Sequence, residues 1–175
     1  MEIWQDQNLT INANTLYGNP IGGTQELVGV NAQITLPAVR NITTEAKLMG
    51  TFTVPILGQL ENMEMTVHHI GIAKRIGILL TQEALELEAR WAQQVMTSDA
   101  KQTIASGRAY ITGYPQIVVP EIDIQPGQSV DLEIPYTVSK YKLIVDGEEI
   151  FNIDRMAKKI VINGKDYYAD LSSVL

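Results

Sequence analysis

The strict alternation of apolar and polar residues near the C-terminus is the feature that most constrains the fold of this chain. The alternating apolar residues are Val130, Leu132, Ile134, Tyr136 and Val138. A period of two places them on one face of a β-strand, and no helix gives that repeat. The apolar phase then slips by one residue near 139–140, which predicts a bulge or bend in the strand.

Two dipeptides predict tight turns after this strand. Asp146-Gly147 and Asn163-Gly164 each lie between short runs of β-forming residues. Both central positions of such a turn need a positive φ angle, which Asp, Asn and Gly adopt most readily. The C-terminal part is therefore expected to form antiparallel hairpins, and the chain as a whole is expected to be mainly β.

The N-terminal half contains two more alternating segments, residues 28–36 and 62–68, and each predicts a half-buried strand. Between them, residues 38–59 mix polar and apolar positions around two glycines and a proline. We expect an extended loop there, and a long ordered loop in a small domain usually has a function.

The segment 85–96 fits two periodicities. Helical spacing fits Ala84, Leu87, Trp91 and Val95, whereas strand spacing fits Leu85, Leu87, Ala89 and Trp91. Intrinsic propensity favours the helix, because Glu, Ala, Leu and Gln dominate the segment. The residues themselves leave both alternatives open, while 103–112 predicts a strand just downstream.

Composition argues against several classes of protein. A length of 175 residues suits one domain, 1–175. The 13 basic residues against 20 acidic ones give a net charge of −7, which argues against tight nucleic-acid binding. The chain has no cysteine, so disulfides and thiolate chemistry are excluded. No apolar stretch is long enough to span a membrane, and no membrane contact is expected.

The polar residues predict neither an enzyme nor a cofactor site. His68 and His69 are adjacent, and neighbours on a strand point to opposite faces, so they cannot bind one metal ion together. Acidic pairs such as Glu86 and Glu88 are more often a solvated face than an acid–base pair. We therefore expect no catalytic, cofactor-binding or metal-binding residues.

Four motifs, in order along the chain, carry a family resemblance. They are LTINANTLYGNP at 9–20, FTVPILGQLENMEMTV at 52–67, LLTQEALELEARWAQQVMTSD at 79–99, and YTVSKYKLIVDGEEIFNIDRMAKKIVINGKDYY at 136–168. Together they cover nearly the whole chain, and the sequence resembles the major tail tube protein family of contractile-tailed phages. It departs from that family at 155–159, which is more basic than the usual pattern.

The resemblance implies a β-sandwich or barrel with one short helix on its flank. It also implies hexameric rings that stack into a tube, with long hairpins forming an inner barrel. On this reading 85–96 is the first strand of a long hairpin, 103–112 returns, and the short helix lies at about 72–80. The loop at 38–59 is expected to mediate stacking between rings.

The resemblance further implies a structural subunit of a tail tube that conducts DNA. The expected partners are other copies of the chain, a tail sheath outside, a tape measure protein and DNA inside, and the baseplate and tail terminator. The expected place is the tail of a virion or phage-like particle, assembled in the bacterial cytoplasm. Two alternatives are the inner tube of a contractile bacteriocin or secretion-type injection particle, and a monomeric β-sandwich that binds a ligand.

The polar faces of four strands, about 28–36, 61–69, 85–96 and 102–113, are expected to line the lumen. Their predicted residues are Asn31, Gln33, Thr35, Asn62, Glu64, Thr66, His68, Glu86, Glu88, Arg90, Gln94, Ser106, Arg108, Tyr110 and Thr112. Three acids against two bases predict a weakly repulsive bore. Arg90 and Arg108 are expected to pair with Glu88 or Glu86 across the hairpin.

A second set of residues is expected to make the contacts between rings. The loop at 38–59 presents several apolar side chains that a monomer would leave unused. They are Ile42, Leu48, Met49, Phe52, Val54, Ile56 and Leu57.

Overall fold

Antiparallel strands make up most of the protein, as the alternation predicts. The computed structural model describes residues 10–70, 74–96 and 101–175. Its elements are β1 (Thr10–Pro20), β2 (Glu26–Val30), β3 (Gln33–Thr35), β4 (Asn41–Lys47), β5 (Thr51–Leu60), β6 (Met63–Ile70), α1 (Ile76–Leu79), β7 (Leu85–Met96), β8 (Gln102–Pro115), β9 (Leu132–Val145), β10 (Glu148–Asp154), β11 (Lys159–Ile162), β12 (Lys165–Asp166) and α2 (Ala169–Ser172).

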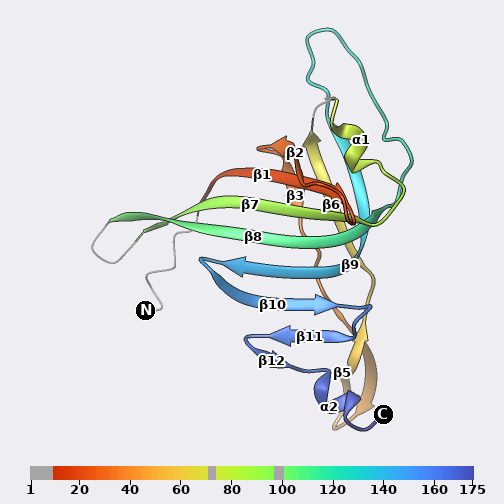
Figure 1. Ribbon diagram of the computed structural model, residues 1–175. Coiled ribbons are helices and arrows are strands. Elements are labelled where there is room, and N and C mark those ends of the chain that lie inside the picture. The colour runs from red at the N-terminus through yellow and green to blue at the C-terminus, as the bar shows by residue number, and fades with distance from the viewer. Residues whose placement is uncertain (1–9, 71–73, 97–100) are drawn as a thin grey trace.

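The strands form one large sheet that folds over a single core, and one separate hairpin. The order along the large sheet is β12-β11-β10-β9-β8-β7-β1-β2, with β6 joined to the first half of β9 and β3 joined to β6. In Figure 1, β6 crosses behind the long strands β1, β7 and β8. Buried residues of both layers belong to one apolar cluster, which includes Met65 and Val67 of β6 and Leu85 and Leu87 of β7.

β9 belongs to both layers because it bends at a bulge. Thr112 of β8 lies opposite Lys140, but the next residue, Gly113, lies opposite Val138. Ser139 is therefore the extra residue, and its hydroxyl donates to the Thr112 carbonyl at 3.2 Å. The predicted slip near 139–140 is confirmed, and its effect is to turn one strand from the back layer into the front one.

A second corner corrects the prediction of one continuous strand at 28–36. The chain forms β2 and β3 instead, and Asn31 between them has a φ of 52°. β2 pairs with β1 and β3 pairs with β6, so this segment passes from one layer to the other. Asn14 holds the corner, because its side-chain amide donates to the Ala32 carbonyl at 2.8 Å. Val30, which the alternation over 28–36 places on the buried face of the predicted strand, is 60% exposed.

The ambiguous segment 85–96 is a strand. β7 pairs with β8 along its whole length, from Leu85 opposite Gly113 to Met96 opposite Gln102. Pairing on both sides outweighs the helical propensity of the residues, since propensity is a weak prior. Further upstream, α1 lies within the predicted helix at 72–80, of which residues 72–73 lie outside the described part. The buried Tyr136 hydroxyl donates to the Leu79 carbonyl at 2.6 Å and ties α1 to β9.

The segment 38–59 is not the extended loop that its mixed composition predicted. It contains most of the β4–β5 hairpin, a two-stranded sheet of its own. The tip turns where Met49 and Gly50 have φ angles of 51° and 120°. Alternation of apolar and polar residues could not predict this hairpin, because the residues of β4 are exposed on both faces apart from half-buried Ala46.

The C-terminal turns form where the sequence predicts them. Asp146-Gly147 joins β9 to β10 and Asn163-Gly164 joins β11 to β12, and all four residues have positive φ angles. The basic segment 155–159 forms the connection from β10 to β11 and the first residue of β11. Arg155 there donates to the carbonyls of Glu61 and Leu60, at 2.9 and 3.3 Å.

Candidate functional site

The non-core sides of β1, β7, β8 and β9 form one continuous surface, here called the polar sheet face. Cross-strand pairing puts Tyr17 opposite Glu88, Glu88 opposite Tyr110, and Tyr110 opposite Lys142. The alternate residues, such as Leu87 and Ile111, are buried in the core. The predicted register of β7 and β8 is thus confirmed as a division into a core side and a polar side.

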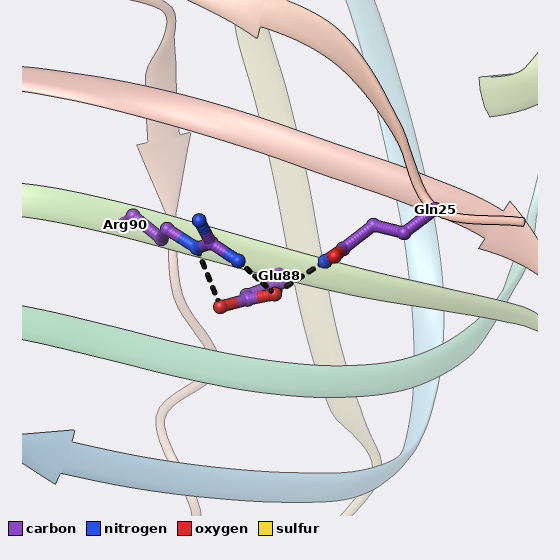
Figure 2. Close-up of polar contacts among 3 residues, drawn as sticks. All are labelled: Gln25, Glu88 and Arg90. Carbon is purple, nitrogen blue, oxygen red and sulfur yellow. Dashed lines mark hydrogen bonds and ion pairs between the residues drawn. The ribbon is translucent and has the colours of Figure 1, made fainter.

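Glu88 is the best-held charge on this face. Arg90 donates to its two carboxylate oxygens at 2.7 and 3.1 Å, and the Gln25 amide donates to it from the β1–β2 loop (Figure 2). Burial alone raises the pKa of Glu88, but these hydrogen bonds and the charges of Arg90 and Arg108 outweigh it and lower the pKa below its ordinary value. The carboxylate therefore stays ionised and fixes the loop to β7.

Arg90 pairs with Glu88 along β7, not across the β7–β8 hairpin as predicted. The residue directly across from Arg90 is Arg108, another cation. Arg90 also lies 4.3 Å from the centre of the Tyr17 ring, a cation–π contact. Its hydrogen bond to Glu88 is the main reason that the pKa of Arg90 is raised.

A hollow of about 490 Å³ opens on the polar sheet face. Glu86 and Glu88 lie on one side of it, and Lys140 and Lys142 of β9 lie on the other. The Lys142 ammonium is 5.7 Å from the centre of the Tyr110 ring. With Arg90 and Arg108, these lysines make cations more numerous than carboxylates on the four strands. The predicted acidic excess does not describe this face, because Glu64 lies on the back layer and the prediction did not place β9 beside β8.

Four of the other residues predicted for the lumen lie on the back layer. Gln33, Thr35, Glu64 and Thr66 project from β3 and β6 on the side away from the core. Because the two layers pack core side to core side, this surface and the polar sheet face point in different directions. Asn31 lies at the corner between the layers, whereas the Gln94 and Ser106 backbones belong to the far part of the β7–β8 hairpin.

The residues predicted for contacts between rings lie along the β4–β5 hairpin. Phe52 pairs with Ala46 and Val54 pairs with Thr44, so these four share one side, while Glu45 and Lys47 lie on the other. Exposed apolar side chains continue to the tip and the base of the hairpin. They are Ile42, Leu48, Met49, Phe52, Ile56 and Leu57.

A long connection was missed by the sequence analysis. Residues 116–131 join β8 to β9 without regular structure, and they border a second hollow of about 510 Å³. Val118, Val119 and Ile124 of this connection are about two-thirds or more exposed. A signal was present, because Pro120 and Pro126-Gly127 interrupt the strand-like alternation of 121–124.

A family comparison decides what these surfaces belong to. Residues 11–175 match the family model described as phage tail tube protein FII. The chain belongs to this family. No curated protein sequence matches it. As a phage tail tube protein, the chain is a structural subunit of a tail tube, and the resemblance in its four motifs is confirmed.

A solved structure shares the fold of this tail tube protein. The matching chain comes from an extracellular contractile injection system, in a structure titled as its PVC sheath-tube complex in the extended state. The TM-score is 0.50 and the identity 11%, over 82% of this chain and 98% of the other. At that identity the likeness shows the fold, which is a mainly β tube-protein architecture.

The described residues of the tail tube protein contain neither a metal-binding cluster nor a membrane-spanning helix. Within 10–70, 74–96 and 101–175, no three His, Asp or Glu side chains gather to hold a metal ion. In the same ranges no helix has the length and apolar character needed to cross a membrane. The two faces of the sheet, the hairpin and the 116–131 connection are therefore the features that a function must explain.

Proposed function

We propose that this tail tube protein closes into six-membered rings that stack into a tube conducting DNA. Unpaired sheet edges carry the proposal. β2 pairs with β1 only from Thr15 to Gly18, and β9 pairs with β8 only as far as Gly107. Among the described residues, the end formed by β1, β7 and β8 thus has a free strand on each side. Free edges invite pairing with other chains, and closure around a ring removes them.

Electron microscopy of the purified protein with its initiating baseplate partner tests this proposal. Stacked rings of uniform diameter are expected, with six copies in each ring. A protein that stays strictly monomeric at high concentration in the presence of the initiator would contradict it.

Within the tube, we assign the lumen to the polar sheet face. Its strands are the longest of the chain and lie side by side, which suits the wall of a barrel (Figure 1). Glu88 and Arg90 neutralise each other there, so the charges are mixed and partly paired. A bore without one dominant sign neither holds phosphate tightly nor excludes it. The back layer, with Glu64 and Thr66, then faces away from the bore.

The β4–β5 hairpin is proposed to join one ring to the next. A two-stranded hairpin is marginally stable in water, so one that is exposed on both faces is expected to gain a partner on assembly. Deleting residues 44–52 removes its tip and should leave a folded subunit that forms no tubes. Circular dichroism checks folding and microscopy checks assembly, and normal tubes from the deletion variant would rule this role out.

The remaining partners follow from the same role: a tail sheath outside, a tape measure protein and DNA inside, and the baseplate and tail terminator at the ends. A structural role without catalysis fits this set, and so does assembly in the bacterial cytoplasm. The fold match to an injection-system tube favours a second candidate, an injection particle that carries protein. Nuclease-protected DNA in purified particles supports the phage tail, and its absence alongside a protein cargo supports the second candidate.

A further inference from the structure

The hairpin and the 116–131 connection lie at opposite ends of the molecule. Figure 1 shows β5 and the hairpin beside α2 at the lower end, and the connection between β8 and β9 at the upper end. Different surfaces at opposite ends can meet head to tail, and such a contact repeats without closing. Stacked copies would therefore bring the hairpin of one subunit near this connection of another.

The tip of the β4–β5 hairpin carries exposed apolar side chains next to a cationic one. Leu48 is 68% exposed, Met49 is fully exposed, and Phe52 is 56% exposed on the same end of the hairpin. Lys47 precedes them, on the polar side of β4 opposite Thr51. The monomer therefore leaves these three apolar side chains exposed to solvent.

The 116–131 connection at the other end borders a hollow that is lined by apolar and acidic side chains. Its hollow of about 510 Å³ is lined by Ile117, Val119, Pro120 and Pro135, and by the carboxylates of Glu121, Asp123, Asp131 and Glu133. Within this lining, all the charged side chains are acidic. The Gln82 side-chain amide holds the start of the connection by donating to the Ile117 carbonyl at 3.0 Å.

We propose that this acidic hollow receives the hairpin tip of a second copy in the adjacent ring. Leu48 and Met49 would cover Ile117 and Val119, while Lys47 would meet the carboxylates. The apolar character and the charge of the two surfaces agree, and complementary charges set the register of such contacts. The inference rests on the proposed stacking role of the hairpin and adds the surface that the hairpin binds.

Disulfide trapping tests the contact directly, because the chain has no cysteine of its own. The double variant L48C with V119C, assembled into tubes and oxidised, is expected to give a ladder of covalent multimers. The matched control is L48C with I162C, whose second site is also exposed but lies at the hairpin's own end. A ladder from the control and none from the V119C pair would overturn the inference.

Charge reversal gives a second, independent readout. K47E is expected to reduce tube yield by about tenfold, because like charges then meet at the contact. Adding E121K to the same chain is expected to restore most of the yield. Tubes unaffected by K47E, or not rescued by E121K, would contradict the acidic hollow as the acceptor. If the 44–52 deletion abolishes tubes while both these tests fail, stacking by the hairpin stands and only its acceptor is wrong.

Discussion

Glu88 shows how one side chain joins a loop, a strand and a neighbouring cation. It is 5% exposed although it lies on the polar side of β7, because Gln25 and Arg90 cover it. A carboxylate covered in this way must be hydrogen-bonded throughout, or its burial would destabilise the fold. The β1–β2 loop therefore depends on the charge state of one residue of β7.

Replacing Glu88 with Gln is expected to lower the free energy of unfolding by about 2 kcal/mol near neutral pH, since charged hydrogen bonds to Arg90 and Gln25 are lost. The pKa of Glu88 is depressed in the folded state, so its stabilisation is complete above the ordinary value of 4.5 and is lost as pH falls through the folded pKa. The difference between wild type and E88Q should shrink in acid.

Urea denaturation of both proteins, near neutral pH and at about pH 3, checks this expectation. E133Q is the matched control, because Glu133 is an exposed glutamate on β9. An E88Q effect that stays constant from neutral pH into acid would show that the ionised form of Glu88 is not what stabilises the loop.

At the scale of elements, the single extra residue in β9 decides which side chains are inside. Before Ser139, Tyr136 and Val138 face the core, and after it Tyr141 does. Lys140 and Lys142 thereby reach the polar sheet face. Side chains alternate along a strand, so one residue more or fewer would exchange the two faces.

Deleting Ser139 is therefore expected to prevent folding, because the register of β9 could satisfy only one of its two layers. The matched variant S139A keeps the bulge and loses only the hydrogen bond to the Thr112 carbonyl, which should cost about 1 kcal/mol. Soluble expression and thermal unfolding of both variants check this. A deletion variant that unfolds cooperatively near the wild-type temperature would show that β9 re-registers freely.

The sequence predicts elements whose signals are local, and it misses features that depend on which strands are neighbours. Asp146-Gly147 and Asn163-Gly164 fix their own turns, so both hairpins were predictable. Strand formation at 85–96 depends on pairing with β1 and β8, and the residues alone left it open. Lys140 was left out of the predicted charge balance for the same reason, since nothing local to it shows that β9 lies beside β8.

At the scale of the whole molecule, two outward surfaces compete for the bore, and cysteine labelling separates them. E86C places a thiol on the polar sheet face and E64C places one on the back layer. In assembled tubes, a maleimide bulkier than the bore should label E64C and leave E86C largely unmodified, while both react in free subunits. Protection of E64C with labelling of E86C would reverse the assignment.

The course of β9 through both layers has a mechanical consequence for the tube wall. Two sheets held together only by apolar side chains can slide under shear, because such contacts have no preferred direction. Here the layers share one backbone, which turns from the back to the front at Ser139, and a second connection crosses at Asn31. Sliding one layer over the other would have to break the backbone hydrogen bonds between strands around these two crossings. A tube wall built from such subunits is therefore expected to resist torsion.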